Sequence, residues 1–134
     1  MTERTFAATD ENLNAVLGFV EEELEALDCP MKLVMQITVS VEELFVNIAH
    51  YAYPGGQGDM QLAIWDTDGV VSIRFSDHGI PFDPLAKADP DVTLSAEQRR
   101  IGGLGIYMVK KSMDSVHYVW EDGQNILTIA KKIR

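Results

Sequence analysis

The chain has 134 residues, of which 46% are hydrophobic and 24% charged, as is usual for a globular protein. Its net charge of −10 argues against a nucleic-acid-binding protein, which would carry a basic surface, and no apolar run reaches the roughly 20 residues of a membrane span. With a single cysteine, Cys29, and no signal-peptide pattern, we expect one cytoplasmic domain over residues 1–134 without an internal disulfide.

The first half of the chain predicts a short strand followed by two helices. Residues 4–8 suit a strand, and Thr9 or Asp10 offers an N-cap for a helix that runs to about Leu27. Apolar residues recur in this helix at helical spacing and glutamates occupy its other face, so one stripe should be buried. A second helix is predicted over residues 30–51, before a loop rich in proline and glycine.

The second half predicts two hairpins with Asp-Gly turns, and the strands are expected near 60–65, 70–75, 115–120 and 125–130. Between the hairpins, residues 78–101 contain three prolines and no sustained period, which is typical of a functional lid. A third helix is predicted from 103 to 113. Because helices and strands are grouped rather than alternating, we expect an α+β sandwich, an antiparallel or mixed sheet with helices covering one face.

Glu43 and Asn47 lie four residues apart on the second predicted helix, so their side chains project from the same face. An amide oxygen can bind Mg²⁺, and a carboxylate one turn away can orient or deprotonate an attacking hydroxyl. The alternative is a solvated acid beside an asparagine that bonds to the local backbone. His50, three residues further on, is explained more simply as an exposed or packed side chain than as a catalytic one.

Two glycine-containing segments are further candidates for the site, one at the end of a predicted strand and one after the long predicted loop. Asp77, at the end of a predicted strand, can accept a hydrogen bond from the amine of adenine, and Gly79 would let the backbone approach the base. The run Gly-Gly-Leu-Gly at 102–105 opens the third helix, where free N–H groups and the helix dipole favour a phosphate. An ordinary turn and a flexible loop are the alternatives. Together with Glu43 and Asn47, these segments predict ATP binding and phosphoryl transfer.

In this order and spacing, the three clusters resemble the N, G1 and G2 boxes of the GHKL ATPases, which include gyrase and the histidine kinases. Glu43-x-x-x-Asn47 with His50, and Gly103-Leu104-Gly105 followed by Met113-Asp114, are most similar to the anti-sigma factor serine-protein kinases. The resemblance implies a Bergerat-type (GHKL) α/β sandwich. It also implies a single histidine-kinase-like ATPase domain with an ATP lid at about 84–101.

The resemblance assigns a role to each matching position. Glu43 would be the general base, Asn47 the Mg²⁺ ligand and Asp77 the acceptor for the adenine amine. The lid would make Arg99 or Arg100 available to the γ-phosphate. The cofactor-binding residues that the resemblance implies are Asn47, His50, Asp77, Gly79, Arg100, Gly102, Gly103, Leu104 and Gly105.

The reaction that the resemblance implies is transfer of the ATP γ-phosphoryl group to a serine of a STAS-domain anti-anti-sigma antagonist. It implies a partner-switching system with a sigma factor as a second partner, a homodimer, and no nucleic acid or membrane. Three alternatives stay open: a module that binds ATP and a partner without phosphotransfer, a detached histidine-kinase-like catalytic domain, and a plain interaction domain without a ligand.

Overall fold

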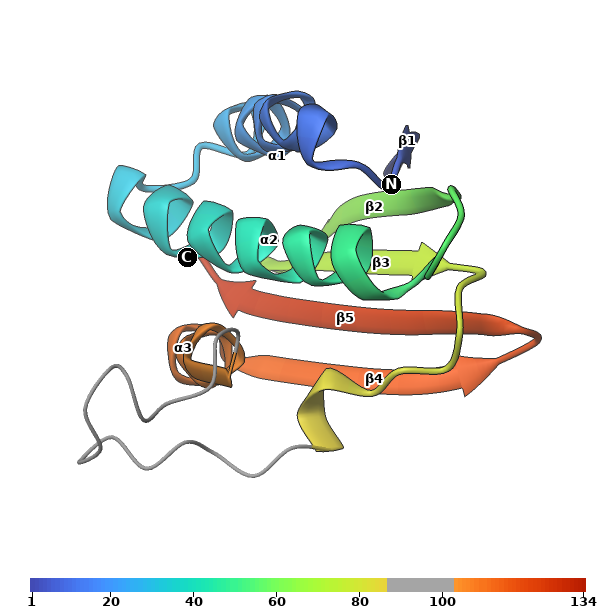
Figure 1. Cartoon of the computed structure of the whole chain (residues 1–134). Coiled ribbons are helices and arrows are strands. Elements are labelled where there is room, and N and C mark those ends of the chain that lie inside the picture. The colour runs from blue at the N-terminus through green and yellow to red at the C-terminus, as the bar shows by residue number, and fades with distance from the viewer. Residues whose placement is uncertain (87–102) are drawn as a thin grey trace.

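The computed structural model describes residues 1–86 and 103–134 (Figure 1). In chain order the elements are β1 (Thr2–Ala7), the 3-10 turn η1 (Asp10–Asn12), α1 (Leu13–Ala26), α2 (Met31–Tyr51), β2 (Asp59–Thr67), β3 (Val70–Asp77), the 3-10 turn η2 (Pro84–Ala86), α3 (Gly103–Ser112), β4 (Ser115–Glu121) and β5 (Gln124–Lys132). The predicted grouping of helices and strands is therefore confirmed.

The strands form one sheet in the order β1-β2-β3-β5-β4, and every pairing among the described strands is antiparallel rather than mixed. Both predicted hairpins are confirmed. Asp68 and Asp122 adopt φ of 52° and 51°, and each is followed by a glycine with positive φ, as a tight hairpin turn requires. β5 pairs with both β3 and β4, so the final strand lies inside the sheet and joins the two hairpins.

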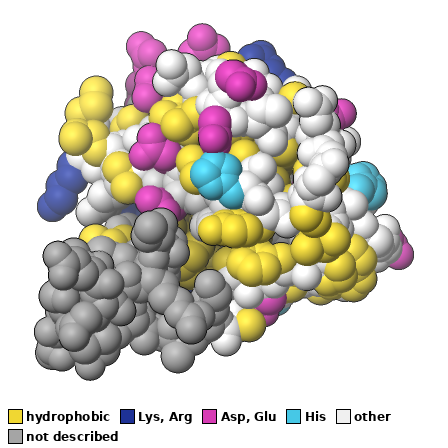
Figure 2. Space-filling view, in the orientation of Figure 1, with side chains coloured by type: hydrophobic (Ala, Val, Ile, Leu, Met, Phe, Trp, Pro, Cys, Tyr) yellow, Lys and Arg dark blue, Asp and Glu magenta, His cyan; other side chains and the backbone are white. Residues whose placement is uncertain are grey.

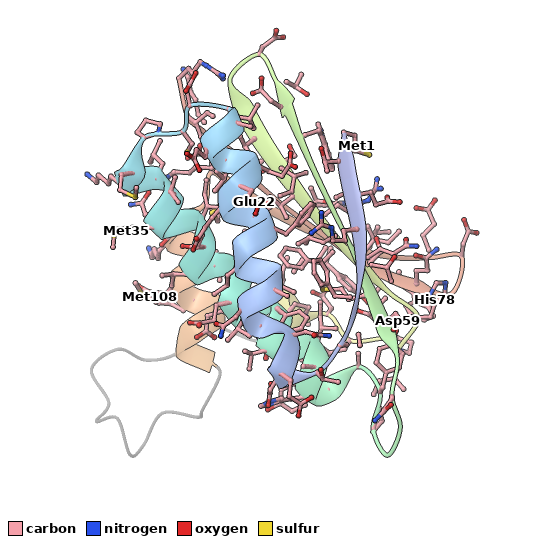
Figure 3. All side chains as sticks on the ribbon, turned by 90° about the horizontal axis from the view of Figure 1, so that it is seen from above. Met1, Glu22, Met35, Asp59, His78 and Met108 are labelled. Atoms are coloured by element: carbon pink, nitrogen blue, oxygen red, sulfur yellow. The ribbon has the colours of Figure 1, made fainter. Side chains whose placement is uncertain are left out.

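The three helices lie on one face of the sheet (Figures 1 and 3). On α2, Val41 and Phe45 are completely buried, and on β3 the alternate residues Val71, Ile73 and Phe75 are each 1% exposed. Because successive side chains of a strand point to opposite faces, this alternation turns the apolar face of β3 toward the helices. The hydrophobic core therefore fills the layer between the helices and the sheet.

The start of the first helix differs from the prediction. Asp10–Asn12 forms a 3-10 turn and the α-helix begins only at Leu13, while Thr9 makes no side-chain capping bond. The Asp10 carboxylate instead lies 2.9 Å from Nε2 of His50, in the last turn of α2. The Asp10 side chain, which the local sequence favours as a helix cap, is thus used in a hydrogen bond with a residue 40 positions away.

The outer face of α1 is acidic, as its sequence predicts. Figure 2 shows Asp and Glu side chains gathered over the upper part of the molecule, where α1 lies, and Figure 3 shows Glu22 on the outer side of this helix. Among the described residues, none of the helices combines the length and the apolar character that crossing a membrane would require.

Candidate functional site

A pocket lies between the second half of α2 and the sheet. Its walls come from α2 and the residue that follows it, from β3, from the segment after β3 and from the β4–β5 hairpin: Leu44, Asn47, Ile48, Ala52, Phe75, Asp77, Phe82, Pro84, Tyr118, Asn125 and Leu127. Most of these side chains are apolar, and the few polar ones converge from separate elements, which is the usual composition of a small-molecule site. The structure therefore brings the predicted residues Asn47 and Asp77 to one pocket.

Asp77 ends β3 and is 4% exposed. Its Oδ1 accepts hydrogen bonds from the Gly79 N–H and from Nδ2 of Asn125, both at 2.9 Å. Neither bond uses Oδ2. A carboxylate oxygen that is set against an apolar wall can accept a hydrogen bond from an amine on a flat ring, as the prediction for adenine requires.

Gly79 is held tightly against the end of α2. A Cβ at this position would overlap the backbone oxygen of Ala52, and the next residue, Ile80, donates its N–H to that oxygen at 2.9 Å. The turn after β3 therefore needs a residue without a side chain because of close packing. The close approach seen here is to the protein backbone, and the approach of Gly79 to a nucleotide base stays a prediction.

Tyr53 also supports this turn. Its hydroxyl donates to the Asp59 carbonyl oxygen at 2.6 Å and accepts the His78 N–H at 3.0 Å. Burial raises the pKa of the Tyr53 phenol, so the hydroxyl keeps the proton that it donates. The ring also occupies the space that a side chain at Gly58 would need. This support joins the residue after Asp77 to the start of β2.

Asn125 is a site residue that the sequence reasoning missed. It lies opposite Asp77 in the β3–β5 register and is 6% exposed. A signal was present in the sequence, because Asn125 alternates with Leu127 and Ile129 and so belongs to the buried face of its strand. A buried amide among apolar neighbours is informative, since polar groups inside a protein are normally paired.

Asn47 and Glu43 follow one another along α2. Nδ2 of Asn47 donates to the Glu43 carbonyl oxygen at 3.0 Å, which is the local backbone bond considered above. This bond uses the amide nitrogen and does not involve Oδ1, the atom type that binds Mg²⁺, and Asn47 is one of the residues that line the pocket. The residues present therefore fit a magnesium ion held by one protein oxygen together with phosphate oxygens and water.

Glu43 lies in a groove between α2 and α3, together with Val39, Gly105 and Met108. A Cβ added to Gly105 would overlap the Glu43 carboxylate, so this carboxylate reaches the first turns of α3. Burial raises the pKa of Glu43, and the negative charge of Glu42 raises it further. The predicted base and the predicted phosphate-binding turn are thus in direct contact.

The remaining predicted residues are placed as follows. His50 is not among the residues that line the pocket, and its ring pairs with Asp10 near the surface. Gly103 and Leu104 begin α3. Arg99, Arg100 and Gly102 lie outside the described residues, as does the predicted lid beyond its first residues, Pro84–Ala86, which form η2.

The sequence matches the family model of the histidine kinase-like ATPase domain over residues 6–131. The chain belongs to this family. Among its relatives, the serine/threonine-protein kinase BtrW of Bordetella bronchiseptica is 29% identical over 94 residues, which are 69% of this chain and 66% of that protein. The serine-protein kinase RsbW of Listeria monocytogenes is 27% identical over 96 residues, 68% of this chain and 61% of that protein. The matched part is slightly less than two thirds of each relative.

Solved structures show that this histidine kinase-like ATPase domain has the expected fold. The RsbU and RsbW domains of Rv1364c from Mycobacterium tuberculosis align with a TM-score of 0.65 at 14% identity, covering 99% of this chain and 33% of that one. The Acinetobacter baumannii histidine kinase AdeS aligns with a TM-score of 0.57 at 14% identity, covering 100% of this chain and 68% of that one. The predicted GHKL-type α+β sandwich is therefore confirmed.

Proposed function

We propose that this ATPase-family domain is a serine-protein kinase that uses ATP and Mg²⁺ to phosphorylate a STAS-domain anti-anti-sigma antagonist in a partner-switching system. The observation that carries the proposal is the contact between the Glu43 carboxylate and the Gly105 position at the start of α3. It supports a base placed where a helix N-terminus can hold a phosphate. Relatives named serine-protein kinases support the same activity.

The nucleotide would lie along α2. Ala52, Asn47 and Glu43 mark three successive points on this helix and its end, from the Asp77 turn to the start of α3. At about 1.5 Å rise per residue, the nine steps from Ala52 back to Glu43 span about 13.5 Å. This length suits a triphosphate nucleotide with its base at Asp77 and its γ-phosphate near Glu43.

The transfer step assigns one task to each residue. Glu43 takes the proton of the acceptor serine while the serine oxygen bonds to the γ-phosphorus. The bond from that phosphorus to the bridging oxygen of the β-phosphate breaks, and ADP leaves. Asn47 Oδ1 would hold the metal ion, which neutralises phosphate charge when bound. A raised pKa makes Glu43 a stronger base at neutral pH than an ordinary glutamate.

A protein acceptor is supported by the surface beside Glu43. Met31, Met35 and Val39 recur every four residues on α2 and are 71%, 62% and 56% exposed, and Met108 on α3 is 49% exposed. Figure 3 shows Met35 and Met108 pointing outward on the same side of the molecule. Flexible methionine side chains adapt to protein surfaces, so a partner docked here could bring a serine to the groove.

The regulatory part of the proposal follows from charge. A phosphoserine carries about −1.5 to −2 charges at pH 7, and this chain has a net charge of −10. Phosphorylation of the antagonist would therefore weaken its complex with the kinase and free the kinase for a sigma factor. A homodimer, a cytoplasmic location and a lid at about 84–101 complete the proposal.

The test is phosphotransfer from γ-labelled ATP with Mg²⁺ to a candidate STAS-domain protein. We expect wild type to label a serine, Glu43→Ala and Asn47→Ala to lose the labelling, and the control Glu22→Ala, an exposed glutamate of α1, to keep it. Labelling that persists in Glu43→Ala would contradict the base assignment. ATP binding without labelling of any STAS partner would favour the binding module that transfers no phosphate.

A further inference from the structure

Asn125 is a buried polar side chain of the pocket to which the proposed function gives no role. It is 6% exposed and lies directly opposite Asp77 in the β3–β5 register. Burying an amide costs free energy unless its donors and acceptors are paired. The partners of this amide therefore show what the residue does.

The four hydrogen bonds that the Asn125 amide can make are all made. Its Nδ2 donates to Oδ1 of Asp77 at 2.9 Å and to the Ile80 carbonyl oxygen at 2.7 Å. Its Oδ1 accepts from the Phe82 N–H at 3.0 Å and from the Tyr118 hydroxyl at 2.5 Å. An amide has two donor hydrogens and two acceptor lone pairs, so none is left for a nucleotide base. Asn125 can therefore act on a base only through its partners, and Asp77 is the partner to which the adenine amine is assigned.

These hydrogen bonds make the two carboxylate oxygens of Asp77 different. Oδ1 receives both N–H donors, from Gly79 and from Asn125, and Oδ2 receives neither. The carboxylate cannot turn about its χ2 angle without losing both bonds, so Oδ2 remains the oxygen for a ligand. An ionised carboxylate accepts hydrogen bonds and donates none. The amine of a 6-amino purine can donate a hydrogen bond to Oδ2. The keto oxygen of a 6-keto purine has no hydrogen to donate and would be repelled by Oδ2.

We propose that Asn125 is a positioning residue for base selection: by fixing Oδ1 of Asp77, it makes Oδ2 a fixed acceptor that selects 6-amino over 6-keto purines. The inference rests on the proposed binding of ATP. The same amide ties the segment after Asp77 to both strands of the C-terminal hairpin. Burial raises the pKa of the Tyr118 phenol, so this hydroxyl stays the donor that Asn125 requires.

The experiment measures the affinities of the chain for ATP and for inosine triphosphate, in which a keto oxygen replaces the amine, by titration calorimetry. Asn125→Asp keeps the shape of the side chain and removes both Nδ2 donors. We expect the preference of wild type for ATP to fall at least about tenfold, because Asp77 loses its orientation. Gln124→Glu is the matched control: it makes the same chemical change one residue earlier on the opposite face of β5, and should leave the preference unchanged.

Equal weakening of both nucleotides in Asn125→Asp would mean a purely structural role and would overturn the inference. If this variant does not fold, Asp77→Asn carries the test. The donors of Gly79 and Asn125 then hold the new amide oxygen at the Oδ1 position and turn the NH₂ group toward the base. The preference should shift toward inosine triphosphate by at least about tenfold, and an equal loss of both nucleotides would overturn the inference. Absence of ATP binding by wild type would instead overturn the proposed function itself.

Discussion

Gly105 connects the packing of α3 to the chemistry proposed for Glu43. Alanine at this position would gain up to about 1 kcal/mol of helix propensity, but its Cβ would overlap the Glu43 carboxylate. Since that carboxylate ends a flexible side chain, it can swing away without unfolding the protein. We therefore expect Gly105→Ala to keep its stability in urea unfolding and to lose phosphotransfer at least about tenfold.

The control for this variant is Gly18→Ala in α1. No atom lies within 4 Å of the Cβ that would be added there. This change should stabilise the protein by about 0.5–1 kcal/mol and leave phosphotransfer intact. Full phosphotransfer activity in Gly105→Ala would show that the position of the Glu43 carboxylate is not needed.

Gly79 differs from Gly105, because the atoms next to it belong to the backbone of Ala52 and not to the end of a flexible side chain. The added Cβ of Gly79→Ala would overlap the Ala52 carbonyl oxygen, which cannot move without shifting the end of α2. We expect a loss of about 1–3 kcal/mol in the free energy of unfolding by urea. Gly56→Ala, where no atom lies within 4 Å, should change it by less than about 0.5 kcal/mol. Equal effects in the two variants would contradict the packing described for the turn.

The pKa of Glu43 leads to a prediction with a definite sign. Burial and then the charge of Glu42 raise this pKa in the folded protein, so folding disfavours the ionised carboxylate. Glu43→Gln should therefore stabilise the protein at pH 7, and the gain should shrink as the pH falls through the raised folded value toward the unfolded value of about 4.3. Urea unfolding at several pH values measures it. If the stability gained by Glu43→Gln increased toward low pH, the pKa of Glu43 would be lowered in the folded protein and not raised.

At the scale of elements, α2 joins the core to the site, and two of its valines test the core. Val41 is fully buried, while Val39, two residues earlier, is 56% exposed. Both alanine substitutions change helix propensity equally, so their difference reports burial. Val41→Ala should cost about 1.5–3 kcal/mol of unfolding free energy, and Val39→Ala less than about 0.5 kcal/mol. Similar losses in both variants would contradict the assigned faces of α2.

The elements that could be predicted are those whose pattern is local. Hydrophobic periodicity predicted α2 nearly to its last residue, and Asp-Gly pairs predicted both hairpins, because a tight turn depends on its own residues. The insertion of β5 between β3 and β4 could not be predicted in this way, since it depends on contacts between distant segments. The role of Asn125 was missed for the same reason, because its partner Asp77 lies 48 residues away.

Binding of ATP and Mg²⁺ should raise the free energy of unfolding of the protein, because the nucleotide binds only the folded state. With Mg²⁺ and ATP at 100 times its dissociation constant, the free energy of unfolding should rise by about 2.7 kcal/mol. Removal of Mg²⁺ with a chelator should reduce this gain in wild type and have little effect in Asn47→Ala, which lacks the proposed metal ligand. Thermal unfolding measures both effects. Asn14→Ala, an exposed asparagine of α1, should behave like wild type. Equal sensitivity to the chelator in Asn47→Ala would contradict its role as a ligand.

The internal place of β5 also determines when the pocket can exist during synthesis. A ribosome produces α2 and β3 first, so Glu43, Asn47 and Asp77 emerge while the sheet still ends at β3. Until β5 emerges and pairs with β3, Asp77 has no Asn125 beside it and β4 has no neighbour in the sheet. A nascent chain therefore carries the proposed catalytic residues before it has an adenine pocket, and nucleotide can assist folding only after translation has passed β5.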